Sequence, residues 1–263
     1  MVLGLVGCVF DRNKIGRYIA CGGEFEYILK NDGSIWSCGD NINGQLGIGS
    51  VGGDFGRSQV TTNINNDVKQ VACGGNHAFI IKNDGSVWCC GKNYNGQLGL
   101  GDTATRDIFT QVINNVRQID CGAYHTFILK NDGSVWCCGR NQCGQLGVGD
   151  SNIRNTFTQI TNDVRQIACG NQDTFIIKND GSVWACGYNG NGELGLGDGT
   201  NRYAFTQVTT NINNDVKQIA CGGLFTFILK NDGSVLGAGY SYGGFPQIGN
   251  STSSYTFSYI TSL

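Results

Sequence analysis

Short apolar stretches alternate with polar turns along the chain, and the pattern recurs about every 50 residues. In the run 116–160, residues rich in β-branched and aromatic side chains predict strands at 116–121, 126–130 and 134–138. Asp132-Gly133 separates the second strand from the third, and Asp-Gly favours a tight hairpin turn. After a Gly-rich loop, 157–160 predicts a fourth strand. Each copy is therefore expected to form a four-stranded antiparallel sheet.

The tract Lys-Asn-Asp-Gly-Ser marks the period, and its Asp residues are spaced by 52, 48, 48 and 52 residues. Five copies of a four-stranded unit predict an all-β fold, a β-propeller of four-stranded antiparallel blades, because closure about an axis protects sheet edges. A solenoid is the alternative. We expect a single propeller domain over 16–263. Its repeats would be 16–60, 68–112, 116–160, 164–208 and 216–260. Residues 1–15 are expected to form an N-terminal strand, either a closing segment or the remnant of a further copy.

Composition agrees with many short strands and excludes some partners. The chain has 42 Gly, one Pro and only 14% charged residues, with a net charge of −2. This balance disfavours nucleic acid as a partner. The apolar stretch 1–10 begins without positive charge and is too short to span a membrane, so neither membrane insertion nor a signal peptide is expected. We therefore expect a cytoplasmic protein, with a released or surface-associated one as the alternative.

Most of the 13 cysteines follow the period. One series is Cys21, Cys73, Cys121, Cys169 and Cys221, and the second, 17 residues later, is Cys38, Cys90, Cys138 and Cys186. Ala238 takes the fifth place of the second series, so these positions suit small core side chains. No C-x-x-C pair exists. Reduced thiols are expected, and disulfides between the two series remain the alternative.

The second copy contains Asp84-Gly85-Ser86-Val87-Trp88, followed by Gly91-x-Asn93-x-x-Gly96-Gln97-Leu98-Gly99-x-Gly101. This pattern resembles the repeat of the regulator of chromosome condensation family. It weakens in the fifth copy, at Leu236, Ser241 and 245–249.

The resemblance implies a propeller, and the best-known members close with seven blades rather than five. Family functions include nucleotide exchange on small GTPases and inhibition of β-lactamases. No copy here has the insertion with which the eukaryotic exchange factor engages its GTPase, and the near-identity of the copies resembles bacterial or phage-borne members.

The copies differ mainly at one end of the predicted ring, where the turn between the first two strands and the loop between the last two emerge. Aromatic, charged and amide side chains there are typical of a protein-binding surface, although drift in exposed loops is the alternative. The candidate partner-binding residues are Glu24, Phe25, Asp40, Asn76, His77, Lys92, Tyr94, Tyr124, His125, Arg140, Gln172, Asp173, Tyr188, Phe225, Tyr240 and Tyr242. The opposite end carries Asn-Asp-Gly in all five copies and is expected to be inert.

Other chemistry is less well supported. His77, His125 and Asp173 occupy equivalent places and were considered as metal ligands, but no pattern around them supports a metal site. The four Trp lie at a fixed strand position, which favours packing between blades over sugar stacking. No catalytic constellation recurs, so we expect no enzymatic activity and no cofactor. The sequence predicts a binding scaffold for a protein, with a glycan or cell-surface recognition propeller, a structural repeat protein and a nucleotide exchange factor as alternatives.

Overall fold

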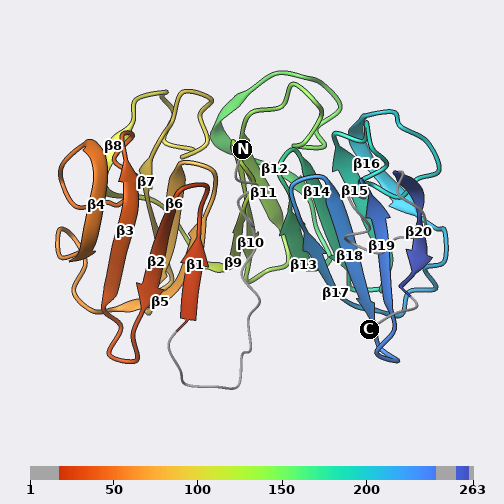
Figure 1. Ribbon diagram of the computed structural model, residues 1–263, viewed down its shortest axis with the longest axis horizontal. Helices are drawn as coiled ribbons and strands as arrows, with labels where there is room; N and C mark the ends of the chain where they lie inside the picture. The colour runs from red at the N-terminus through yellow and green to blue at the C-terminus, as the bar shows by residue number, and fades with distance from the viewer. Residues whose placement is uncertain (1–17, 241–252, 261–263) are drawn as a thin grey trace.

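The computed structural model describes residues 18–240 and 253–260, and its strands form five four-stranded antiparallel sheets (Figure 1). We call these sheets blades 1 to 5 in chain order. The expected fold class, an all-β propeller of four-stranded blades, is confirmed. The predicted N-terminal strand, Tyr242 and the departures at Ser241 and 245–249 lie outside the described residues.

Each blade is a simple meander of strands a, b, c and d. The a strands are β1 (Tyr18–Cys21), β5 (Val68–Cys73), β9 (Val116–Cys121), β13 (Val164–Cys169) and β17 (Val216–Cys221). The b strands are β2 (Phe25–Leu29), β6 (His77–Lys82), β10 (His125–Lys130), β14 (Asp173–Lys178) and β18 (Phe225–Lys230). The c strands are β3 (Ile35–Asn41), β7 (Ser86–Gly91), β11 (Val135–Gly139), β15 (Val183–Gly187) and β19 (Val235–Gly239). The d strands are β4 (Gly52–Gln59), β8 (Arg106–Asn114), β12 (Arg154–Thr161), β16 (Arg202–Val208) and β20 (Ser254–Tyr259).

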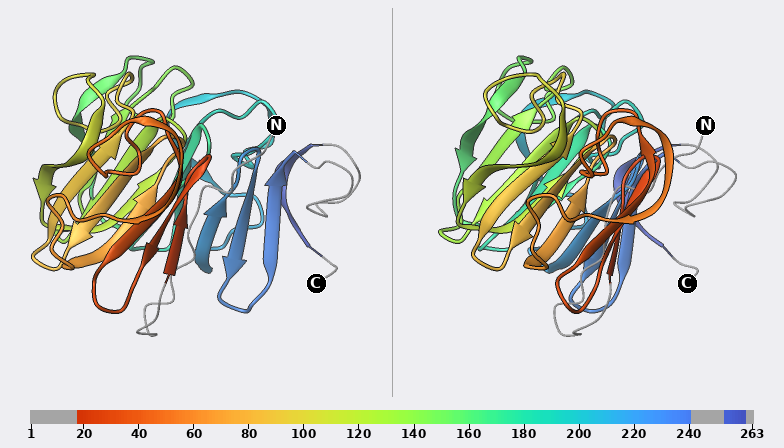
Figure 2. Two further views of the ribbon diagram at one scale, coloured as in Figure 1. Left: turned by 60° about the vertical axis from the view of Figure 1, so that its left-hand side comes forward. Right: turned by 90° about the vertical axis from the view of Figure 1, so that its left-hand side faces the viewer.

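The blades stand side by side in chain order as an arc, with blades 1 and 5 at its two ends (Figures 1 and 2). Each a strand contacts the a strand of the next blade, so the a strands line the inside of the arc and the d strands its outside. The described residues form four buried apolar clusters, one at each junction between consecutive blades. No such cluster joins blade 5 to blade 1 within the described part of the chain.

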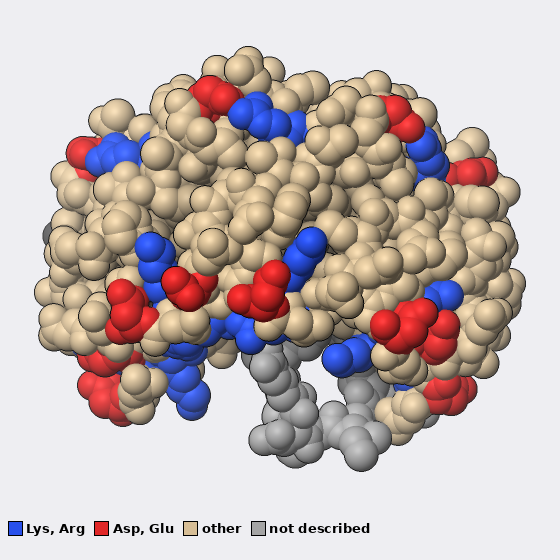
Figure 3. All heavy atoms as spheres, turned by 180° about the vertical axis from the view of Figure 1, so that it is seen from behind, with Lys and Arg blue, Asp and Glu red and all other residues tan. Residues whose placement is uncertain are grey.

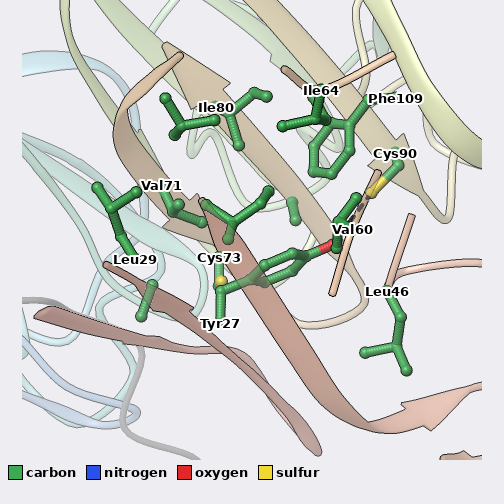
Figure 4. Packing of buried hydrophobic residues seen from close by; sticks show 14 of the residues in the cluster. Tyr27, Leu29, Leu46, Val60, Ile64, Val71, Cys73, Ile80, Cys90 and Phe109 are labelled. Atoms are coloured by element: carbon green, nitrogen blue, oxygen red, sulfur yellow. Dashed lines mark hydrogen bonds between the residues drawn. The ribbon is translucent and has the colours of Figure 1, made fainter. Parts of the chain in front are cut away.

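Aromatic side chains fill these junctions. Phe127 on β10 is fully buried and meets Phe205 of blade 4 edge-on, with ring centroids 6.3 Å apart. Figure 4 shows the equivalent contact in the first junction, where Tyr27 points toward Cys90 and Phe109 of blade 2. In blade 5 the equivalent Phe227 is only half-buried. The hydrophobic core therefore lies between blades rather than within them.

The Asn-Asp-Gly turns organise the b and c strands. Asp132 Oδ1 accepts hydrogen bonds from the Ser134 N–H (2.9 Å) and hydroxyl (2.6 Å), which hold the pKa of Asp132 below its usual range. Ser134 Oγ in turn accepts from Trp136 Nε1 at 3.0 Å, and Lys130 Nζ lies 4.2 Å from the Trp136 ring centre. Trp136 packs against the cluster between blades 2 and 3. Trp88 and Trp184 likewise pack against the clusters between blades, as the fixed position of the tryptophans predicted.

Each c–d loop fastens onto the outer strand of the next blade. Asn141 Oδ1 accepts from the Leu146 N–H (3.0 Å), and its Nδ2 donates to the Asp150 carbonyl (2.7 Å). Val148 then forms a β-bridge with Ala204 in β16 of blade 4. The outer strands begin earlier than the sequence predicts, at 154 rather than 157 in blade 3, where Arg154 pairs with Gly139 of the c strand in the same blade.

The twelve cysteines among the described residues are free thiols. Burial raises the pKa of the Cys90 thiol to about 12, so this thiol stays protonated.

In the described ranges no helix is long and apolar enough to span a membrane. Nor do the residues of those ranges form a group of three or more His, Cys, Asp or Glu side chains placed to hold a metal ion.

Candidate functional site

The a–b turns and c–d loops emerge together at one end of the arc, the upper end in Figure 1. We call this end the mouth, and the opposite end, with the b–c turns and d–a connections, the turn end. At the mouth, a backbone hydrogen bond joins each a–b turn to the start of the c–d loop of its own blade. In blade 3 the Arg140 N–H donates to the Tyr124 carbonyl at 2.9 Å, and in blade 2 Lys92 donates to Asn76 at 2.8 Å. This bond brings the variable residue of the a–b turn next to the first variable residue of the c–d loop in the same blade.

His77 and His125, predicted to face a partner, are instead fully buried. His77 Nε2 lies 3.0 Å from Thr126 Oγ1 of the next blade, and His125 Nε2 lies 2.9 Å from Thr174 Oγ1. Burial lowers the pKa of each imidazole to about 3, so both are neutral at physiological pH. The prediction is corrected here: the b strand begins beneath its a–b turn, and the histidines join blades instead of meeting a ligand.

Asp173, at the equivalent place in blade 4, is also buried. Burial first, and then the nearby Glu193 carboxyl, raise the pKa of Asp173 well above its usual range. Phe25 is buried against Tyr27, with ring centroids 6.1 Å apart. Asp40 is buried within its own loop, where it accepts hydrogen bonds from Gln45 Nε2 (2.6 Å) and the Ile42 N–H (3.1 Å). These three side chains therefore do not form part of the exposed mouth.

A second group of candidates does gather at the surface of blades 2 and 3. Tyr94 is 64% exposed, and Lys92 Nζ lies 5.6 Å from its ring centre and 5.9 Å from that of Tyr124 in the next blade. Arg140 stacks on the same Tyr124 ring, with its Cζ 5.5 Å from the centre, and its Nε donates to Gln142 Oε1 at 2.9 Å. We call these five side chains the mouth cluster. None of them makes an ion pair with a described carboxylate.

The remaining candidates lie around the mouth without joining this cluster by a described contact. Those that are exposed or partly exposed are Glu24, Asn76, Gln172, Tyr188, Phe225 and Tyr240. Gln172 contacts Cys143, whose thiol lies 3.2 Å from Gln172 Oε1. Sequence reasoning did not include Cys143, although it stands where three other copies have Asn. That break in the repeat was the available signal.

Asp120 was missed as well. It lies on the inner strand β9 at a position that is Ala in the other four copies. Its carboxylate accepts from the Cys121 N–H (3.0 Å) and from the Cys169 N–H of blade 4 (2.9 Å). Burial raises the pKa of Asp120 to about 7, against the opposing effect of these hydrogen bonds. Asp120 therefore replaces the Ala of the other copies with an ionisable side chain. Like Cys143, it can be recognised by aligning the five copies.

The model of the RCC1-like domain family matches residues 6–259. The mouse X-linked retinitis pigmentosa GTPase regulator is 36% identical over 96 residues, which is 36% of this chain and 10% of that protein. This chain thus spans about a tenth of the length of such curated relatives.

Two solved structures are similar across most of the chain. Human WBSCR16 gives a TM-score of 0.80 at 25% identity, covering 92% of this chain and 66% of that one. Prp20p of Saccharomyces cerevisiae, described with its binding to Gsp1p and histones, gives 0.81 at 20% identity, covering 93% and 63%. These relatives are eukaryotic, so the bacterial or phage origin suggested by the near-identical copies has no support.

Proposed function

Because the chain belongs to the family of RCC1-like domains, we propose that it is a non-enzymatic binding scaffold that recognises a protein partner through its mouth. The observation that supports this most directly is the mouth cluster. Tyr94 is exposed and Tyr124 partly exposed, and Lys92 and Arg140 lie over these rings without a carboxylate partner among the described residues. Tyrosine and arginine dominate the binding energy of protein interfaces, because they combine large contact area with few rotatable bonds per contact.

The described loops favour a protein partner over a glycan. Equivalent glycan pockets would require similar side chains at each junction, whereas the cluster lies on blades 2 and 3 and the other copies repeat only its Tyr94, as Tyr242. A single asymmetric patch suits one protein surface.

The test is to replace Tyr94, Tyr124 and Arg140 together by Ala and to compare the proteins captured from native lysate by mass spectrometry. We expect the main captured partner to be lost, since each such anchor contributes about 2 kcal/mol, or about thirtyfold in affinity. A matched control replaces Arg57, Tyr203 and Tyr255, which are surface residues of the outer strands. An unchanged partner set in the mouth variant would contradict the proposal.

Regulation of a small GTPase is the second candidate, and it rests on the relatives. One relative is named a GTPase regulator, and Prp20p is described as binding Gsp1p. The mouth variant separates the two functions in the same experiment when nucleotide release from candidate small GTPases is measured alongside capture. Accelerated release by the parent chain that is lost in the variant would favour exchange. Capture without accelerated release would favour a scaffold.

We also propose a reducing, cytoplasmic location. The free thiols among the described cysteines support it, because an oxidising compartment would threaten the exposed Cys21 and the partly exposed Cys143. Labelling of the unfolded, unreduced protein with a thiol reagent should return a count close to the 13 cysteines of the sequence. A count several thiols lower would instead indicate secretion.

A further inference from the structure

The inner strands carry an irregularity that repeats from blade to blade at the turn end. In blade 3, Lys130 pairs with Val116 while Leu129 pairs with Gln118, so Arg117 has no partner across the ladder. Residue 117 is thus the extra residue of a β-bulge. Bulges turn the side chain of the extra residue away from its normal position in the sheet.

The same register shift occurs in blades 2, 4 and 5. In each case the extra residue is basic, and the four are Lys69, Arg117, Arg165 and Lys217. The equivalent of blade 1, Arg17, lies outside the described residues. A β-bulge thus recurs in four blades, and its extra residue is a Lys or Arg each time. This regularity indicates a shared role for the four basic side chains.

Contacts between blades place these cations next to one another. Arg117 Nη2 donates to the Val164 carbonyl of blade 4 at 2.8 Å, and Val164 immediately precedes Arg165. Arg165 Nη2 donates in the same way to the carbonyl of Val216, which immediately precedes Lys217. Each guanidinium still has donors left to bind a ligand. Arg117, Arg165 and Lys217 are therefore neighbours along the inside of the blades, and Lys69 occupies the equivalent bulge position in blade 2. We call these four cations the basic arc.

The basic arc is not neutralised from within. None of its four members makes an ion pair with any described carboxylate, and Lys69, Arg117 and Lys217 are exposed. Other lysines at this end are already engaged. Lys82 and Lys230 pair with aspartates at 3.2 Å and 2.7 Å, and Lys130 lies over Trp136.

The surroundings restrict which anion can reach the basic arc. The b–c turns place five aspartates farther out on the same end, namely Asp32, Asp84, Asp132, Asp180 and Asp232. Figure 3 shows acidic and basic side chains gathered along this lower edge, seen from behind. A broad polyanion, such as a nucleic-acid backbone or an anionic membrane, would meet these aspartates and be repelled. A narrow anionic chain laid along the inside of the blades would approach fewer of them, with Asp132 of blade 3 the one that lines the hollow described next.

A hollow beside the bulge of blade 3 offers room for such a chain. It is lined by Asn115, Lys130, Asn131 and Asp132. Asn115 lies two residues before Arg117, and Lys130 pairs with Val116, so the hollow adjoins the basic arc. Its amide side chains can bond the backbone of an extended peptide while the arginines bind carboxylates in their forked geometry.

We propose that the turn end binds a short acidic peptide segment of a protein partner, with consecutive Asp or Glu side chains paired to Lys69, Arg117, Arg165 and Lys217. This surface is separate from the mouth and does not depend on what the mouth binds. It assigns a ligand to the end of the molecule that the uniform turns would otherwise mark as inert.

The experiment titrates the folded chain into a fluorescein-labelled peptide of six consecutive glutamates and follows fluorescence anisotropy at low salt. We expect saturable binding that weakens as salt is raised. Lys69→Gln with Lys217→Gln should weaken it about tenfold, since each exposed charge pair contributes a factor of up to about five. These two lysines make no described hydrogen bond, so the variant should fold, and circular dichroism checks that it does. Lys69→Arg with Lys217→Arg should retain binding.

A control variant, Arg57→Gln with Arg202→Gln, removes the same charge from the outer strands and should bind the peptide as the parent does. Equal affinity of the parent and the Lys69/Lys217 glutamine variant would overturn the proposal. So would tighter binding of inorganic tripolyphosphate or of a 12-nucleotide single-stranded DNA than of the glutamate peptide.

Discussion

At the scale of single residues, the repeat shows where one copy departs from the others. Asp120 is the clearest case, because four other copies place Ala at this inner-strand position. Its carboxylate accepts a hydrogen bond from the next blade, but burial opposes its charge. Asp120 also affects the thiols of Cys169 and Cys221. Burial raises the pKa of both thiols, and nearby carboxylates raise it further. A charged residue has thus entered a site built for a small apolar one.

Asp120→Asn tests this cost through pH. The folded pKa of about 7 lies above the unfolded value of about 3.9, so ionisation destabilises the folded state above pH 7. The penalty shrinks as pH falls from 7 toward 4, because the unfolded carboxyl then takes up the proton that the folded carboxyl already holds. The amide does not titrate. We expect the free energy of unfolding of the variant, relative to the parent, to rise by about 2–3 kcal/mol from pH 5 to pH 8.

Urea unfolding of both proteins at the two pH values measures this difference. The buried histidines follow the opposite trend, since their pKa is lowered to about 3, but they are present in both chains and cancel. A difference that stays constant between pH 5 and pH 8 would show that Asp120 does not titrate in this range.

At the scale of strands and loops, the sequence predicted what local chemistry determines. The strand expected at 116–121 is β9 within the same bounds, and Asp132-Gly133 forms the expected hairpin turn. Contacts between copies could not be predicted in this way. The β-bridge between Leu100 in the loop of blade 2 and Thr156 in the outer strand β12 of blade 3 is one such contact.

The same limit explains the candidate site. Variation among copies selected four members of the mouth cluster, which are exposed or partly exposed, but it also selected His77 and His125, which are buried. Sequence differences do not distinguish a surface position from a buried one whose partner comes from the next blade. The basic arc was missed for the opposite reason: its charge is the same in every copy, and a bulge is visible only in the strand register.

At the scale of the whole molecule, five blades form an arc with four apolar junctions, and the two end blades differ from the middle ones. Phe127 is enclosed by the following blade, whereas Phe227 of blade 5 is half-buried and contacts Phe225, with ring centroids 5.3 Å apart. Equivalent positions in the repeat therefore contribute differently to stability, according to their place in the arc.

Phe127→Ala and Phe227→Ala form a matched pair that measures this difference. The first should lower the free energy of unfolding by about 3–5 kcal/mol, since it leaves a cavity between two blades. Phe227→Ala should lower the free energy of unfolding by roughly half as much, because the Phe227 ring buries less apolar surface than the Phe127 ring. Denaturant unfolding of the two variants beside the parent gives both values. Equal losses would mean that blade 5 is enclosed as fully as blade 3.

The c–d loops give the arc a mechanical property. Each loop holds the outer strand of the following blade by a β-bridge, through Ile48, Leu100, Val148 and Leu196 in turn. A force that pulls on the two ends of the chain would therefore meet these attachments in series rather than together. Among the residues that the structure describes, an end blade is attached on one side only. Under tension the molecule would lengthen stepwise from its ends, one blade at a time, while the middle blades that carry the mouth cluster kept their shape longest.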